Sequence, residues 1–314
     1  MYKKIIILFL FFYNHHSLIA QYAEHVAPEF IKTIQFLGST KQSQLPIIRL
    51  GEKVYLSFDA LNGNEADYYY KITHHDFDWR LSDLTKGEYM DGFDDVRLYE
   101  YSNSFNTLKG YSHYTLNIPN RDTRKLTKSG NYMVSIYNDN GELVFSKKFM
   151  IIENKVTVDA SVKRARNLEN IQTKQVVQFV IDSPNLILTN PKETVNTLIL
   201  QNSNLNTPIT NLKPQYTIGS QLIYRYDKEA SFDAGNEYLF FDNKDIRSGS
   251  SSIRKIDLTD IYNTYLYTNS ARFERPYTYN PDINGNYQIR ILYPTSDISI
   301  EADYARIHFK LQYF

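Results

Sequence analysis

The feature that most constrains the fold of this chain is the shortness of its apolar runs. Short runs rich in Tyr, Val, Ile, Phe and Thr alternate with clusters of Asn, Asp, Gly and Ser. Beyond the N-terminal region, no window of about 11–18 residues keeps apolar side chains at helical spacing. The pattern therefore predicts an all-β chain of consecutive antiparallel, immunoglobulin-like β-sandwich domains.

The runs also give approximate strand positions. Asn140-Gly141 separates two of them and predicts a tight hairpin. The predicted strands are residues 54–58, 67–73, 114–118, 132–137, 143–152, 156–162, 175–181, 194–201, 221–226, 237–242, 253–258, 287–292 and 304–312.

A short internal repeat suggests the number of domains. Gly130 and Gly285 are each followed by Asn-Tyr and then by an alternating pattern that predicts a strand. Gly-Asn tolerates the positive φ of a turn, so each copy predicts the turn into the last hairpin of a sandwich. We therefore expect one sandwich domain over residues 21–154 and a second over residues 155–314.

The first 20 residues have the layout of a secretory signal peptide. Lys3 and Lys4 precede an unbroken apolar run at residues 5–13, and Ala20 provides a cleavage point. A helix of this length covers about 14 Å, roughly half of a bilayer core. No later run approaches about 18 apolar residues. We therefore expect residues 1–20 to be removed and the mature chain to be exported without a helical membrane span.

Charge and cysteine content exclude several classes of function. The 35 basic and 35 acidic residues give a formal net charge of zero, which argues against nucleic-acid binding, because phosphate contacts need a cationic surface. The absence of cysteine excludes disulfides, thiolate metal sites and cysteine catalysis.

The densest polar cluster has two interpretations. On a strand, His74, Asp76 and Asp78 would share one face, where they could bind a metal ion together with a partner such as His113. Alternatively, the strand ends here, Trp79 fills the core and the polar groups bind loop backbone. Nothing in the sequence places His113 nearby, so we favour the structural interpretation and expect no metal.

The sequence also gives little support for catalysis. Glu88, Asp91, Asp94 and Asp95 are acidic neighbours of aromatic residues, which are usually solvated loop residues. The sequence contains no Gly-x-Ser-x-Gly elbow, Walker loop or His-Glu-x-x-His motif. We therefore expect no catalytic residue, no cofactor and no small-molecule substrate.

An ordered series of short motifs resembles a known family. The motifs are residues 34–36, 54–59, 70–79, 88–93, 104–107, 111–114, 119–120, 129–132, 201–202, 235–237, 241–242, 282–287, 301–304 and 308–309. The series resembles the type IX secretion system plug protein family of Bacteroidota, from about residue 30 onward. The resemblance implies a periplasmic protein without enzymatic activity. Such a protein would dock on the periplasmic side of the outer-membrane β-barrel translocon and close its pore.

The resemblance marks particular residues, which we interpret as turn and core determinants. None of them can be assigned to the translocon contact. They are His74, Asp76, Trp79, Gly92, Phe93, Asn106, Tyr114, Gly130, Tyr132, Gly285, Tyr287 and Tyr304.

Two departures from the family pattern stand out. Members usually have Cys where this chain has His75, which favours a packing role over a thiol role. Members also continue into a further β domain, whereas this sequence stops at Phe314. The resemblance therefore implies that this sequence is a truncated member of the family.

Other functions fit the same composition. An exported carbohydrate-binding or polysaccharide-processing module would share the sandwich fold and the aromatic residues. An outer-membrane barrel would explain the alternation over residues 306–313 and the final Phe314, but the chain lacks regular strands of about ten residues.

Overall fold

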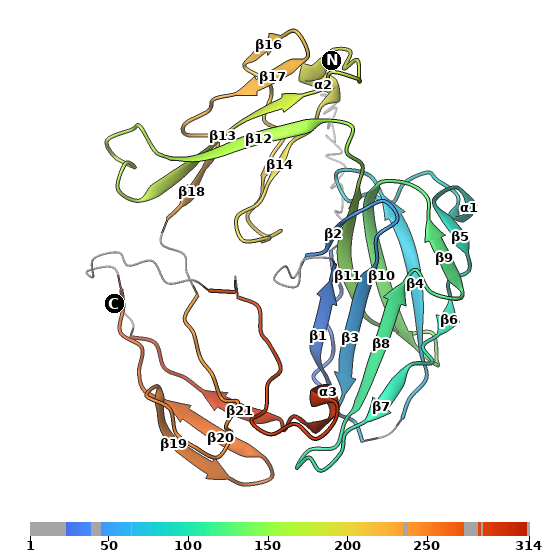
Figure 1. The fold of residues 1–314 in the computed structure, drawn as a ribbon, viewed down its shortest axis with the longest axis vertical. Coiled ribbons are helices and arrows are strands. Elements are labelled where there is room, and N and C mark those ends of the chain that lie inside the picture. The colour runs from blue at the N-terminus through green and yellow to red at the C-terminus, as the bar shows by residue number, and fades with distance from the viewer. Residues whose placement is uncertain are drawn as a thin grey trace, which may run out of the picture.

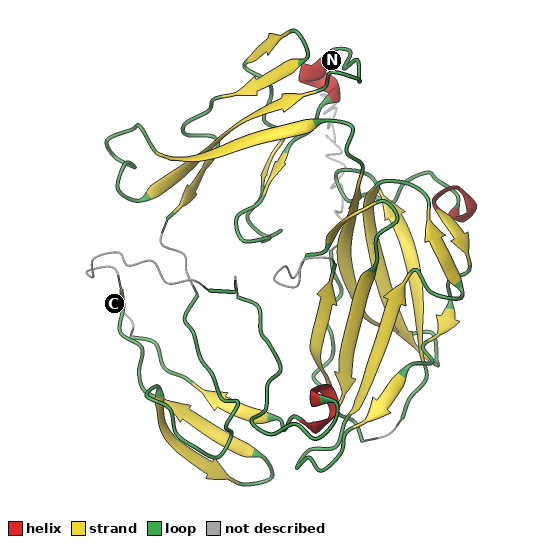
Figure 2. Cartoon of the chain, in the orientation of Figure 1, coloured by secondary structure: helices red, strands yellow, loops and turns green. Residues whose placement is uncertain are grey.

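The structure, a computed structural model, describes residues 23–38, 45–63, 65–234, 238–272, 282–283 and 285–312. The predicted signal peptide and Phe314 lie outside these ranges. The described chain is almost entirely β, with several antiparallel sheets, which confirms the predicted fold class (Figures 1 and 2).

The first half forms a sandwich of two sheets. One sheet has the order β1 (Ile31–Leu37), β3 (Val54–Ala60), β8 (Ser112–Ile118) and β7 (Tyr101–Asn103). The other has the order β2 (Ile47–Arg49), β11 (Leu143–Ile152), β10 (Gly130–Asn138), β4 (Tyr68–His75) and β6 (Val96–Arg97). The β10–β11 hairpin predicted at Asn140-Gly141 is confirmed, with Gly141 at a φ of 77°.

Aromatic side chains fill the core between these sheets. Phe58 stacks on Tyr114 with ring centroids 5.2 Å apart, and meets Phe145 edge-on at 5.1 Å. Tyr68 meets Tyr114 edge-on at 4.9 Å. Because successive side chains of a strand point to opposite faces, burying Phe58 in this core turns its neighbour Asp59 to the outer face of the sheet.

The described part of the second half contains two larger sheets and a two-stranded one, in which β14 (Leu198–Ile199) pairs with β15 (Ile209–Thr210). The first has the order β12 (Thr157–Arg164), β13 (Lys174–Asp182), β17 (Gln221–Tyr224) and β16 (Tyr216–Ile218), and β18 (Ser231–Asp233) also pairs with β13. The second consists of β19 (Ile253–Leu258), β20 (Tyr262–Leu266) and β21 (Ala305–His308). The remaining elements are α2 (Pro191–Thr194) and α3 (Ile298–Glu301).

The path of the chain brings its last part back to the first sandwich. The chain leaves β11 for the β12–β13 sheet, continues to β19 and β20, and returns through α3 (Figure 1). In the figure, α3 lies at the foot of the sandwich beside β1, β3 and β8. Contacts between α3 and β8 place the returning segment on the sheet that contains Asp59.

Several strand predictions in the second half are wrong. Residues 194–201 contain the end of α2 and the two-residue β14, and residues 238–242 and 287–292 form no strand. Of residues 304–312, only 305–308 belong to β21. The repeat at Gly130 leads into β10 as predicted, but the repeat at Gly285 leads into an irregular segment. The division at residues 154 and 155 stays a prediction.

A small two-stranded antiparallel sheet beside the first sandwich requires glycine. It pairs β5 (Met90–Gly92), which follows α1 (Lys86–Tyr89), with β9 (Thr123–Leu126). Gly92 has a φ of 110°, and a Cβ atom there would lie 2.1 Å from the carbonyl oxygen of Asp122. An L-side chain at position 92 would therefore be strained and would displace backbone.

We predict that Gly92→Ala lowers the free energy of unfolding by more than about 1 kcal/mol, because both the backbone angle and the close approach oppose a Cβ atom. Urea denaturation measures the change. Gly110→Ala is the matched control, since a Cβ atom at Gly110 meets nothing within 4 Å. Equal stability of the two variants would contradict the argument.

Candidate functional site

Two buried polar residues lie on the outer face of the first sandwich. Asp59 of β3 pairs with His113 of β8, and both side chains point away from the aromatic core. The Nδ1 atom of His113 lies 2.5 Å from Oδ1 of Asp59. The two residues are only 2% and 8% exposed, so another part of the chain covers this face.

The returning segment provides that cover through Tyr304. The Tyr304 hydroxyl donates to Oδ2 of Asp59 at 2.5 Å and also contacts the hydroxyl of Thr33 on β1. Burial raises the pKa of Tyr304 well above its usual value, and the nearby charge of Asp59 raises it further. The phenol therefore remains a proton donor to the carboxylate.

Tyr111 holds the same segment from the other side. Its hydroxyl donates to the carbonyl oxygens of Ser299 at 2.9 Å and Ala302 at 3.0 Å. Its ring meets that of Tyr304 edge-on, with centroids 5.2 Å apart. Burial raises the pKa of Tyr111, so this hydroxyl also stays protonated.

Two backbone amides of the loop between β7 and β8 complete the contact, one through a backbone acceptor and one through a side-chain acceptor. The amide of Phe105 donates to the carbonyl of Ile300 at 2.9 Å, and the amide of Leu108 donates to Oδ1 of Asp303 at 2.7 Å. Asn106, between them, has a φ of 57°. We call Thr33, Asp59, Tyr111, His113 and Tyr304, with these two hydrogen bonds, the Tyr304 junction.

The Tyr304 junction can fix two chain segments together, and its geometry does not favour catalysis. An Asp-His pair also orients the base in many hydrolases. Here, donors of the protein occupy both oxygens of Asp59, and the returning segment covers the pair. Four of the sequence motifs meet at this point, in residues 54–59, 104–107, 111–114 and 301–304. Sequence analysis marked Asn106 and Tyr304 and named His113 only as a possible metal partner, and it did not single out Thr33, Asp59 or Tyr111 as site residues.

A second contact between the two halves forms around Trp79. Trp79 clusters with Leu45 and Met150, and Leu200 and Leu205 from the second half pack against this cluster. We call these five residues the Trp79 junction.

Polar groups hold Trp79 in place. The ammonium group of Lys148 lies 4.2 Å from the centre of the Trp79 ring, a cation–π distance. The ring nitrogen Nδ1 of His75 lies 3.1 Å from the carbonyl oxygen of Trp79. His75 is almost fully buried, and burial lowers its pKa.

His74 is held by neighbours and has no metal-ligand geometry. Its Nδ1 lies 2.8 Å from the Ser82 hydroxyl, and its Nε2 lies 3.2 Å from the carbonyl oxygen of Ser129. Its ring meets Tyr132 edge-on at 4.9 Å, and a Cβ atom on Gly130 would lie 2.4 Å from Nε2. Within the described ranges, no group of three or more His, Asp or Glu residues could hold a metal ion.

Three other motif residues of the first sandwich have local roles. The carbonyl of Asp76 accepts a bond from the Asn131 side chain. Tyr114 bonds both backbone groups of Ala66. Tyr132 donates to the Lys128 carbonyl at 2.8 Å. Each of these bonds ties a side chain to backbone elsewhere in the first sandwich, and the interpretation of the motif residues as turn and core determinants stays a prediction.

Phe93 and Gly285 make none of the contacts of either junction, whereas Tyr287 lies near the Tyr304 junction, since burial and then the charge of Asp59 raise its pKa. Phe93 is largely exposed. The side-chain amide of Gln35 donates to the Tyr287 carbonyl at 3.4 Å. A Cβ atom on Gly285 would clash with the Tyr238 ring, so this glycine allows a close approach.

The four carboxylates considered for catalysis are each engaged locally. Glu88 accepts from both the amide and the hydroxyl of Thr85. The other three form ion pairs: Asp91 with Arg124, Asp94 with Lys86, and Asp95 with Lys71.

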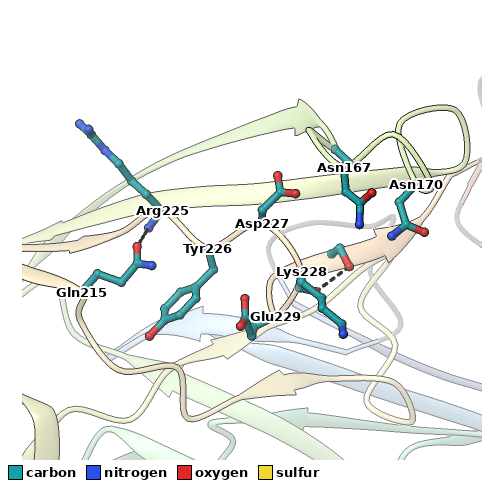
Figure 3. Close-up of a pocket in the computed structure, with 10 residues that line it drawn as sticks. Asn167, Asn170, Gln215, Arg225, Tyr226, Asp227, Lys228 and Glu229 are labelled. Carbon is teal, nitrogen blue, oxygen red and sulfur yellow. Dashed lines mark hydrogen bonds between the residues drawn. The ribbon is translucent and has the colours of Figure 1, made fainter.

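A polar pocket of about 380 Å³ lies in the second half, away from both junctions. Asn167 and Asn170, from the loop after β12, face the stretch after β17 that includes Asp227 and Glu229 (Figure 3). The Tyr226 hydroxyl donates to the carbonyl of Lys213 at 3.0 Å. Amide and carboxylate groups of this kind could bind the hydroxyls of a small polar ligand.

The fold and the junctions define a class of protein: linked all-β modules whose buried polar groups join distant parts of one chain. Comparison with known proteins then gives the family. The model of the type 9 secretion system plug protein 1st domain matches residues 31–153, which is the first sandwich. The chain therefore belongs to the type 9 secretion system plug protein family, as the sequence motifs suggested, and this connects it with type IX secretion.

A solved structure shares the fold over most of the chain. The crystal structure of a hypothetical protein from Parabacteroides merdae has a TM-score of 0.85 and 31% sequence identity. The match covers 92% of this chain and 73% of that one. The comparison with curated proteins gives no match. Among the described residues, we find no helix with the length and apolar character needed to cross a bilayer.

We predict that Tyr304→Phe lowers the free energy of unfolding by about 1–3 kcal/mol, because the buried Asp59 loses a donor. Hydrogen exchange of residues 298–304 should accelerate at the same time. Tyr293→Phe, at an 86% exposed tyrosine, is the control and should leave both unchanged. A Tyr304→Phe variant that behaves like this control would contradict the role of the hydroxyl.

We also predict that Leu205→Lys shifts the fluorescence emission of Trp79 to longer wavelength, because the charged side chain opens the Trp79 junction to water. Trp79 is the only tryptophan in the sequence, so the signal has one source. Leu198→Lys, at an exposed leucine of β14, is the matched control. An unchanged emission maximum in Leu205→Lys would show that the two halves do not meet there.

Proposed function

We propose that this chain is a periplasmic plug that docks on the outer-membrane translocon of the type IX secretion system and closes its pore. The observation that carries the proposal is the family match over the first sandwich. The fold similarity over 92% of the chain adds that both halves occur together in a second protein.

The two junctions give physical support for a plugging role. Closing a pore requires bulk and a fixed shape, and does not require a reactive group. The Tyr304 junction joins the C-terminal part to β1, β3 and β8, and the Trp79 junction joins the loop after β14 to the other sheet of the sandwich. A chain fastened at two separate points can resist deformation better than modules on a single linker.

The same observations favour a non-enzymatic protein. The Asp59–His113 pair resembles part of a catalytic triad, but it is covered by Tyr304, and protein donors bind both oxygens of Asp59. The predicted signal peptide would deliver the mature chain to the periplasm, where it can reach the inner opening of an outer-membrane pore.

We predict that the tagged full chain co-purifies with the translocon barrel from detergent extracts. We also expect that deleting its gene makes the outer membrane more permeable to a solute too large for ordinary porins, because the pore stays open. The untagged strain is the control for the purification, and a complemented deletion is the control for permeability. Recovery equal to the untagged control, with unchanged permeability, would refute the plugging role.

A carbohydrate-binding module is the second candidate, and the pocket near Asp227 is the observation that favours it. Its amide and carboxylate groups beside Tyr226 are of the kind that bind sugar hydroxyls. Micromolar binding on a glycan array that is lost in Asp227→Ala would favour this function over plugging. No binding on the array would leave the plug as the better proposal.

A further inference from the structure

The second half of the chain carries a long open strand edge. The eight residues of β12 pair with β13 in continuous register, without a shift. In the part of the chain that the structure describes, β12 has no partner on its other side, and all eight residues are exposed.

Other edges of the described sheets are better protected. The edge strands β2, β6, β7 and β16 have only two or three residues each. The edge strands β1 and β19 contain register shifts. Short length, bulges, proline and charged side chains are the usual ways in which soluble proteins prevent a strand edge from pairing with other chains, and of these β12 has only the charges of Asp159, Lys163 and Arg164.

The geometry identifies the backbone groups that are free to pair. The amide of Ala165 donates to the carbonyl of Lys174, which lies on the β13 side. Because hydrogen-bonding direction alternates along an antiparallel strand, the backbone groups of Val158, Ala160 and Val162 point away from β13. The free edge therefore presents three consecutive outward donor-acceptor pairs.

The side chains of these residues form an uncovered apolar row. The register places Val158 beside Ile181, Ala160 beside Phe179 and Val162 beside Val177. Phe179 and Ile181 belong to the small core of this sheet, yet Val158 and Val162 are 56% and 66% exposed. The core face therefore continues onto β12 without a covering layer, and a strand added here would need apolar side chains at alternate positions.

The charge at the end of β12 further defines the complementary strand. Lys163, Arg164 and Arg166 follow one another within four positions. The Lys163 ammonium group bonds the Gln178 side chain, and Nε of Arg164 bonds the Ile171 carbonyl, so these contacts leave the positive charges without a carboxylate. A carboxylate on the added strand opposite this end would complement the cations.

We propose that β12 is a docking strand, to which the translocon adds an extended segment of its own by β-augmentation. This segment has alternating apolar residues and an acidic residue opposite Lys163 and Arg164. The inference rests on the proposed function and names the surface through which the plug binds. A single added strand buries less than the roughly 1,200 Å² of a stable interface, so other surfaces contribute to the affinity.

Two variants test the docking strand in the tagged full chain. Ala160→Pro removes an outward amide while leaving the β13 ladder intact, and Val162→Lys places a charge in the apolar row. Each should reduce the recovery of translocon barrel from detergent extracts by at least about tenfold. Ile218→Lys is the matched control, at an exposed residue on the opposite edge strand β16, and should keep wild-type recovery.

The outcomes separate the docking strand from the plugging role. Wild-type recovery with both β12 variants would overturn the docking strand while leaving the plug in place. If the wild-type chain itself recovers no barrel, both proposals fail. Thermal unfolding checks that each variant folds, and Val162→Lys decides the matter if Ala160→Pro does not fold. A wild-type dimer in light scattering that Ala160→Pro converts to a monomer would assign the edge to a second copy and overturn the translocon as its occupant.

Discussion

The arrangement of the two halves depends on the buried carboxylate of Asp59. Strand alternation turns Asp59 out of the aromatic core, onto a face where water would normally hydrate it. Covering a charged carboxylate costs several kcal/mol unless hydrogen-bond donors replace the lost water. His113 from the same sheet and Tyr304 from the far end of the chain provide those donors. The C-terminal segment can therefore close over this face only where Tyr304 reaches Asp59, and this requirement sets its position.

The Trp79 junction is of a different physical kind. It joins the halves through apolar contact, which does not require a single hydrogen-bond geometry, while the cation–π interaction with Lys148 holds the Trp79 ring within the first half. The hydrogen bonds of the Tyr304 junction fix the alignment of the returning segment. The apolar contacts of the Trp79 junction add further attraction between the halves. With both junctions in place, a force on the second half is transmitted to the sandwich at two places.

The sequence predicted the first sandwich well because its strands alternate around one core. Residues 54–58, 132–137 and 143–152 show this alternation clearly, and each lies within an observed strand. The same pattern misled in the second half, where residues 287–292 alternate but lie in an irregular segment. Periodicity records which side chains are buried and says nothing about whether the backbone has a neighbouring strand.

The candidate site was harder to predict for a related reason. Asp59 and His113 occupy outward positions of their strands, where polar residues are expected on any solvated sheet. Nothing local indicates that residues so far along the chain will cover them. The family motifs marked Tyr304 and the neighbourhood of Asp59, but their meeting point required the three-dimensional structure. Likewise, the sequence pattern predicts a strand at residues 156–162, which corresponds to β12. The pattern does not show that this strand lies at the open edge of its sheet.

The sequence separation across the Tyr304 junction has a consequence for how the molecule assembles. Tyr304 bonds residues 245 and 271 positions earlier in the chain. Local hairpins such as β10–β11 close small loops, while this contact must close a very large one and gains nothing until the intervening sheets exist. During synthesis from the N-terminus, the first sandwich can therefore fold while Asp59 and His113 are still hydrated. The Tyr304 junction forms last. Because the Tyr304 junction forms last, we expect it to be the first contact to open under a protease or an applied force.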